Sequence, residues 1–400
     1  MRSAVRFMTL PLAVLAAAGT FLIASEIHFV QPAGLTVHEW GTFTSVAGED
    51  GSAVEWNTLG CKSDLPRFVN DYGFRGFKFI LPATVRMETP VLYFYSAREL
   101  DARVKVSFPH GLITEWYPHA DYLVYQKSGD GSMKPLQRNL NGIDTSLRNL
   151  TGAIEWNNVK VQPGKSPELP VEKEATDYYA ARAVDAAPVA VGGEYEKFLF
   201  YRGVGRFPVP LSARIEGDGK IRVDNRAGEA LRGVILFENR GGKLGYRVVG
   251  TVHETVLLDP PPLDAPFAQL RQDLETALIA QGLFPREAHA MVETWKDSWF
   301  EEGSRLIYIV PSAAVDANLP LEVEPAPVEI KRVFVGRIEL ITPETQRAVE
   351  SAIAINDWAT VDRYGRFLNP ILQRTYGNTA RTSEVQNLFR LHQQSAGACR

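Results

Sequence analysis

The chain has 400 residues, of which 45% are hydrophobic and 22% are charged, and its formal net charge is −4. This composition is typical of a globular protein, and the length favours two domains. A net negative chain offers no strongly basic surface for a phosphate backbone, so we expect no nucleic-acid partner.

Residues 1–25 have the features of an export signal. Arg2 and Arg6 precede an uncharged apolar run at 7–23, and two small residues follow the run. A positive start, an apolar stretch and a small-residue end are the three parts of a secretory signal. The apolar run also approaches the length of a membrane span, so a retained N-terminal membrane anchor is the alternative. Both interpretations predict an extracytoplasmic protein, either periplasmic or secreted.

Residues 35–258 predict a β-rich domain. Short segments rich in β-branched and aromatic residues indicate strands at 91–96, 103–108, 197–202 and 233–239. Asp-Gly and Gly-Gly pairs, which are typical of type I′ hairpin turns, occur at 50–51, 130–131, 218–219 and 241–242. This pattern favours a mainly β, antiparallel β-sandwich-like domain.

A proline-rich linker at 259–266 is the predicted domain boundary. After it, residues 267–400 predict a smaller α+β domain that ends in helices. Helical periodicity or helix-start signals occur at 267–278, 285–299, 342–353 and 357–368, and strand patterns occur at 305–310 and 332–341. We expect the last helix to be kinked at Gly365 and Pro370.

The chain contains two cysteines and no recognisable catalytic motif. Export would permit a disulfide between Cys61 and Cys399, and two unpaired thiols are the alternative. A zinc-protease motif needs a second histidine three residues after His38-Glu39, where Thr42 stands instead. The sequence has no GxSxG elbow. It therefore identifies no cofactor.

Glutamate–tryptophan pairs recur in the β-rich part, at Glu39-Trp40, Glu55-Trp56, Glu115-Trp116 and Glu155-Trp156. Adjacent strand residues point to opposite faces, so the simple interpretation places tryptophan in the core and glutamate in water. That interpretation suits Glu55 and Glu155. Glu39 and Glu115 share their faces with apolar neighbours, so burial would require a cationic partner or a raised pKa.

A cluster of Glu39, Glu88 and Glu115, with Arg86 as the cationic partner, follows from this pattern. Arg86 and Glu88 share a strand face with apolar residues, as the other two glutamates do. Two interpretations are open. The cluster is either a buried ion-pair network, or a set of paired catalytic carboxylates for acid–base chemistry.

Other candidate site residues are two histidines and two aromatic residues. His38 or His119 would suit a divalent metal if either approached a carboxylate, and a hydrogen-bonded structural histidine is the alternative. Trp116 and Tyr117, with Arg86, are the candidate binding residues. The aromatic pair would form an exposed platform for sugars or peptides, and core packing is the alternative.

Several segments together resemble a family of exported bacterial proteins that has no assigned function. The segments are HEWGTFTSVAG, METPVLYFYS, GLITEWYP, FLFYRGVG, AMVETWKDSWFEEG and FVGRIELITP. The resemblance spans nearly all of the chain after the signal and implies that these segments belong to one unit. It brings no activity, cofactor or catalytic residue with it.

Two functional hypotheses follow. The first is a non-catalytic binding or envelope-associated structural role, with a glycan or an envelope protein as partner. The second is an extracytoplasmic hydrolase, such as a glycan hydrolase, that uses Glu39, Glu88 and Glu115. Two carboxyl groups about 5 to 10 Å apart in an open cleft would favour the hydrolase, whereas buried and ion-paired carboxylates would favour the structural interpretation.

Overall fold

The computed structural model describes residues 29–56, 65–71, 83–136, 147–173 and 176–376. The predicted export signal and both cysteines, Cys61 and Cys399, lie outside these residues. The chain divides into two compact units, Met1–Val30 and Gln31–Arg400, and the second contains all the elements discussed below.

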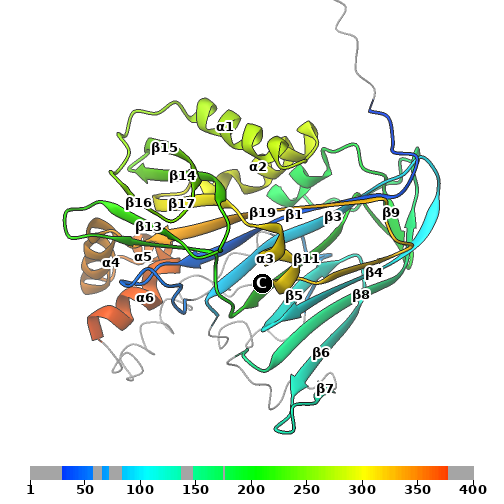
Figure 1. Cartoon of the computed structure of the whole chain (residues 1–400), viewed down its shortest axis with the longest axis horizontal. Coiled ribbons are helices and arrows are strands. Elements are labelled where there is room, and N and C mark those ends of the chain that lie inside the picture. The colour runs from blue at the N-terminus through cyan, green and yellow to red at the C-terminus, as the bar shows by residue number, and fades with distance from the viewer. Residues whose placement is uncertain (1–28, 57–64, 72–82, 137–146, 174–175, 377–400) are drawn as a thin grey trace, which may run out of the picture. The chain divides into compact units, whose positions relative to one another are not determined.

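A nine-stranded sheet forms the centre of this unit (Figure 1). Its strands, in spatial order, are β15 (Lys243–Val252), β14 (Leu231–Arg240), β17 (Gly303–Ile309), β19 (Glu329–Leu340), β1 (Thr36–Val46), β3 (Val85–Tyr95), β11 (Leu199–Gly205), β5 (Gly111–Tyr117) and β2 (Asn70–Asp71). Neighbouring strands are antiparallel, except that β1 and β19 run parallel.

Two further sheets accompany the first. The seven-stranded sheet has the order β10 (Glu194–Glu196), β9 (Val189–Val191), β8 (Leu150–Val161), β4 (Leu100–Pro109) and β18 (Leu321–Glu324), with β6 (Asp121–Lys127) beside β8 and β7 (Met133–Leu136) beside β6. The three-stranded sheet has the order β12 (Leu211–Ile215), β13 (Ile221–Asn225) and β16 (Thr255–Leu258). The predicted fold class, mainly antiparallel β with a smaller helical part near the C-terminus, is confirmed.

The helices are α1 (Phe267–Ala280), α2 (Pro285–Trp299), α3 (Ser312–Asn318), α4 (Pro343–Ile355), α5 (Trp358–Arg363), α6 (Gly365–Tyr376) and the 3₁₀ helix η2 (Asp177–Arg182). α4 begins where predicted, because the hydroxyl of Thr342 accepts a hydrogen bond from the Thr345 amide at 3.1 Å. The expected break near Gly365 separates α5 from α6, while Pro370 lies inside α6. No helix in the described part of the chain is long and apolar enough to span a membrane.

Both faces of the nine-stranded sheet are covered. On one face, Tyr201 of β11 packs in the common core with Trp156 of β8, with ring centroids 6.5 Å apart. On the other face, the Tyr95 hydroxyl donates to Glu287 of α2 at 2.8 Å. In Figure 1, α1 and α2 lie on one side of β19, β1 and β3, and β4 and β8 lie on the other. Every residue of β1 is therefore buried, including both members of the Glu39-Trp40 pair.

The predicted linker at 259–266 does not divide the central sheet. β14 precedes the linker and pairs with β17, which follows it, and β1 lies between β3 and β19. The predicted domains at 35–258 and 267–400 thus contribute strands to one sheet, and 259–266 connects β16 to α1. Strand β19 pairs with β1, although the paired residues are 293 positions apart in the sequence. Patterns of neighbouring residues cannot predict a contact between segments so far apart.

The Asp-Gly turns differ from the expected type. A type I′ turn requires positive φ at both central positions. In the three Asp-Gly pairs the glycines at 51, 131 and 219 have positive φ, near 80°, but the aspartates before them do not. Each aspartate instead accepts a hydrogen bond from the backbone amide two residues later, at 2.9 to 3.1 Å. Gly241 and Gly242 both have positive φ, as a type I′ turn between β14 and β15 requires.

A buried group of charges joins β17, β19 and α6. The carboxylate of Glu339 is fully buried and contacts three guanidinium groups, those of Arg305 at 2.7 Å, Arg337 at 2.6 Å and Arg366 at 2.9 Å. Burial raises the pKa of Glu339, but the three arginines outweigh this effect and hold the pKa well below its ordinary value of 4.5. Removal of one partner from such a buried group leaves an uncompensated charge.

We expect Glu339→Gln to lower the free energy of unfolding by about 3 to 5 kcal/mol at pH 7, because three buried arginines would lose their carboxylate. The depressed pKa in the folded state means that Glu339 stabilises the fold above pH 4.5, and that this stabilisation is lost as the pH falls towards the folded-state pKa. Urea unfolding at pH 7 and pH 3.5 measures both effects, and the variant should show the weaker pH dependence.

Glu216→Gln is the control, because Glu216 forms a half-exposed pair with Arg214. Loss of such a pair changes stability by at most about 1 kcal/mol. An unfolding midpoint of Glu339→Gln equal to that of the wild type at pH 7 would contradict the prediction.

Candidate functional site

Glu39 lies between the two large sheets and is held by an ion pair. Its side chain is fully buried, and its carboxylate accepts hydrogen bonds from the Tyr201 hydroxyl and, at 2.6 Å, from Nε of Arg332. Arg332 stands beside Glu39 in the register of β1 and β19 and also donates to Asp316 at 2.8 Å. Burial opposes the charge of Arg332, but Glu39 outweighs it and raises the pKa of Arg332 above its ordinary value. Arg86, the predicted cationic partner of the glutamates, is therefore not the partner of Glu39, and it lies beside Glu88 instead.

Glu88 and Glu115 point away from Glu39, towards the helical face of the sheet. Glu88 is the register partner of Thr42, and Thr42 and Glu39 alternate to opposite faces of β1. The carboxylate of Glu88 lies 3.5 Å from Nε of Arg86. Glu115 faces Arg202 in the register of β5 and β11 and accepts a hydrogen bond from the Thr114 hydroxyl. The three predicted catalytic glutamates therefore do not form one cluster, and each is at least 95% buried.

The aromatic candidates are also in the interior. Trp116 stacks on Tyr122 with ring centroids 5.4 Å apart, and Tyr117 packs beside Phe68 at 4.8 Å. Both side chains are buried, and as adjacent residues of β5 they point to opposite faces of the sheet. They do not form the exposed platform that the sequence suggested.

The histidine candidates lie in different settings. His38 is buried, with Nδ1 2.7 Å from the carboxylate of Glu287 and its ring stacked on Phe284 at 4.5 Å. His119 is exposed, and its backbone amide donates to Glu194 at 2.5 Å. Among the described residues, no three side chains of the kinds that bind metals come together as a metal site would require.

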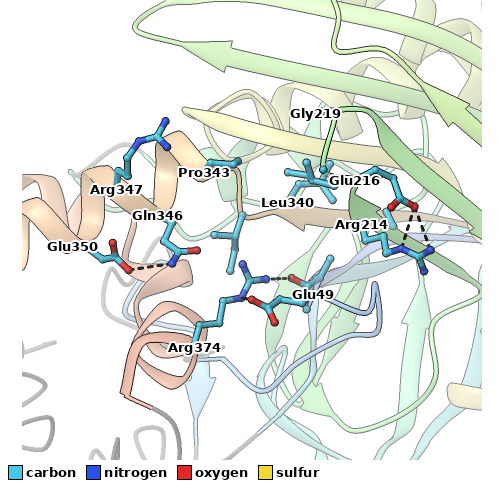
Figure 2. A pocket seen from close by; sticks show the side chains of 16 residues that line it. Glu49, Arg214, Glu216, Gly219, Leu340, Pro343, Gln346, Arg347, Glu350 and Arg374 are labelled. Atoms are coloured by element: carbon cyan, nitrogen blue, oxygen red, sulfur yellow. Dashed lines mark hydrogen bonds and ion pairs between the residues drawn. The ribbon is translucent and has the colours of Figure 1, made fainter.

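An open cleft of about 610 Å³ lies at the end of β1 and β19, between the β12–β13 hairpin and helices α4 and α6 (Figure 2). Its charged lining residues are three arginines and three glutamates: Arg214, Arg347, Arg374, Glu49, Glu216 and Glu350. Its main apolar lining residues are Ile215, Leu340, Ile341 and Pro343. The lining thus combines balanced charge with apolar side chains.

Most charged groups of the cleft have close partners. Glu350 accepts hydrogen bonds from Gln346 at 3.0 Å and from Thr375 at 2.9 Å. Arg347 donates to Glu344 at 3.0 Å. Arg214 contacts Glu216 at 3.2 Å, and dashed lines mark this pair in Figure 2.

Arg374 is held more loosely than its neighbours. Its guanidinium lies 4.0 Å from Glu49, whose side chain is 79% exposed, and 3.4 Å from the carbonyl oxygen of Ala47. Burial lowers the pKa of Arg374, and the carboxylate of Glu49 opposes this effect only in part. A guanidinium that is partly desolvated and incompletely neutralised favours an added anion.

No pattern in the sequence indicates this cleft. Arg374 belongs to the predicted terminal helix region, and Arg214 belongs to an ordinary strand, so neither forms a motif with its neighbours. The lining comes from four separate parts of the chain: 47–49, 213–219, 340–350 and 374. Only the folded arrangement brings these parts together.

Glu39→Gln should lower the free energy of unfolding by about 3 to 5 kcal/mol, because the buried Arg332 would lose its buried carboxylate and keep only that of the exposed Asp316. Glu155→Gln is the matched control from another glutamate–tryptophan pair. Glu155 contacts the partly exposed Arg103, so its loss should cost at most about 1 kcal/mol. Chemical denaturation of both variants measures the difference, and a Glu39→Gln protein as stable as Glu155→Gln would contradict this assignment.

Comparisons with known proteins give no family. No protein-family model matches the chain, and no curated protein matches it. Among solved structures, the Fcho1 Mu homology domain of Danio rerio with a bound Eps15 peptide has a TM-score of 0.30 at 9% identity, covering 78% of this chain and 97% of that chain.

The yeast delta-COP-I mu-homology domain gives a TM-score of 0.29 at 8% identity, covering 77% of this chain and 97% of that one. The same domain in complex with a Dsl1 WxWxV peptide gives 0.29 at 9% identity, covering 77% and 98%. At such TM-scores, these similarities carry no argument about what this chain does, and the chain is assigned to no family.

Proposed function

We propose that this protein is exported and acts outside the cytoplasm as a non-catalytic binding protein, with the cleft beside Arg374 as its binding site. The observation that carries the proposal is the state of the Arg374 guanidinium, which lines an open cleft and, among the described residues, makes two polar contacts, both of them long. The export signal predicted at 1–25 supports the location.

The chemistry of the cleft favours a ligand with a carboxylate. A guanidinium presents paired N–H donors in a plane, and this geometry matches the two oxygens of a carboxylate. Arg214 provides a second, half-exposed guanidinium in the same lining. The apolar surface of Ile215, Leu340 and Ile341 suits an apolar group on the same ligand.

The positions of the predicted catalytic glutamates give the hydrolase hypothesis no support. A hydrolase of that kind needs two carboxyl groups that face one open cleft. Glu39 lies on the opposite face of the sheet from Glu88 and Glu115, and all three are buried.

Arg374→Met should weaken the binding of N-acetyl-leucine at least about tenfold, because a hydrogen bond to a charged group contributes about 1.5 to 3 kcal/mol. Saturation-transfer NMR titration measures the affinity, with N-acetyl-leucinamide as the probe that lacks the carboxylate. Arg347→Met is the control at the same cleft, since Arg347 is exposed and paired with Glu344. Equal binding of the acid and the amide, or no effect of Arg374→Met, would exclude the proposed site.

Export is tested separately by removing residues 2–25. The full-length chain should appear outside the cytoplasm of an expressing bacterium, and the truncated chain should remain inside, as measured by cell fractionation. Mass spectrometry of the exported chain distinguishes cleavage after Ser25 from a retained anchor. A full-length chain found only in the cytoplasm would rule out the proposed location.

A further inference from the structure

The cleft borders the open edge of a β-strand. β12 pairs with β13 on one side and is the last strand of the three-stranded sheet in the described part of the chain. Ala213, Arg214 and Ile215 of this strand line the cleft. The backbone of β12 is therefore part of the lining surface, together with its side chains.

The hydrogen-bond pattern shows which backbone groups of β12 face the cleft. At the turn, the Glu216 amide donates to the Lys220 carbonyl, so Glu216 and Lys220 form a hydrogen-bonded pair. Hydrogen-bonded and non-hydrogen-bonded pairs alternate along an antiparallel ladder, so the next pair, Ile215 and Ile221, exchanges no hydrogen bonds. The amide and carbonyl of Ile215 thus point away from β13.

The hydrogen bond of Ala213, two residues before Ile215, agrees with this alternation of inward and outward backbone groups. Its amide also points away from β13, and it donates to the carbonyl of Gly51 at 3.3 Å. Gly51 covers the edge only at that position. No other described segment hydrogen-bonds to the outward backbone groups of Ile215.

The space beside this edge extends to both sides of Ile215. A smaller cavity of about 230 Å³ adjoins the cleft, and the two share Ile215, Gly219, Leu340 and Pro343 in their linings. The smaller cavity adds apolar surface from Ile221 and Leu236 and prolines at 260 and 261. An extended chain lying along the edge would have room for a side chain in each hollow.

From this geometry we infer that the ligand of the cleft is an extended peptide that adds to the outer edge of β12. This inference rests on the proposed function and specifies its ligand class. One residue of the peptide exchanges two backbone hydrogen bonds with Ile215, as in other cases of β-strand addition. A carboxylate of the peptide reaches Arg374, and apolar side chains contact Leu340 and Ile341. A sugar polymer offers no matching row of alternating N–H and C=O groups.

Hydrogen exchange followed by mass spectrometry tests the backbone contact. The probe is an equimolar mixture of random pentapeptides with free C-termini, and the matched probe is the same mixture with N-methylated backbones. We expect exchange in the segment 211–217 to slow at least tenfold at saturating peptide, because the Ile215 amide gains a hydrogen-bond acceptor. The N-methylated mixture should leave the exchange rate unchanged.

Two glycine variants test the position of the peptide: one places a large side chain in the cleft, and the other is its control outside the cleft. Gly217 and Gly129 occupy equivalent places in two hairpin turns with the same hydrogen bonds, and an added Cβ would meet nothing within 4 Å at either position. Gly217 lines the cleft, and Gly129 does not. Gly217→Trp should abolish the protection of 211–217 by the peptide mixture, and Gly129→Trp should preserve it.

The outcomes separate this inference from the proposed function. If N-acetyl-leucine binds in an Arg374-dependent manner but pentapeptides give no protection at 211–217, the cleft binds a carboxylate and the peptide inference is overturned. Arg374-dependent binding of oligogalacturonate without any effect of the pentapeptides overturns it as well. If no carboxylate probe binds at all, both proposals fail.

Discussion

The parallel pairing of β1 with β19 is the contact on which the rest of the fold depends. It joins the first long strand to a strand 293 positions later, and it brings Glu39 beside Arg332. Because the second sheet and the helices cover the two faces, the carboxylate needs this guanidinium to be tolerated in the interior. The same two strands then end together at the cleft, where Ala47 and Leu340 are both lining residues.

Local patterns in the sequence predicted the elements well and their partners poorly. The amphipathic spacing at 285–299 and the Thr342-Pro343 start both indicated helices at the observed places. Alternation along a strand is also local, but it identifies a solvent face only when one face of the sheet is open. At Glu155 one side is partly open, and the side chain lies at 14% exposure beside Arg103, whereas at Glu39 both sides are covered.

The candidate site could not be predicted for a related reason. Arg374 stands out because no described residue lies close to its guanidinium as an ion-pair partner, and a missing contact leaves no mark in the sequence. Glu49, which partly neutralises Arg374, belongs to a turn more than 300 positions earlier in the chain. The carbonyl oxygen of Ala47, which Arg374 also contacts, is equally distant in sequence. The residues that looked most unusual instead have structural contacts: His38 joins the sheet to α2 through Glu287, and Glu39 joins β1 to β19 through Arg332.

Because the chain is synthesised from its N-terminus, β1 is made well before β19, with which it pairs. Ribosomes add about 5 to 20 residues per second, so β19 follows β1 by roughly 15 to 60 s. During that interval β1 can pair with β3, but its other edge stays open, and the strand carries the apolar and β-branched residues that promote intermolecular pairing. The central sheet therefore closes only after most of the chain has been made, and until then the second edge of β1 lacks its native partner.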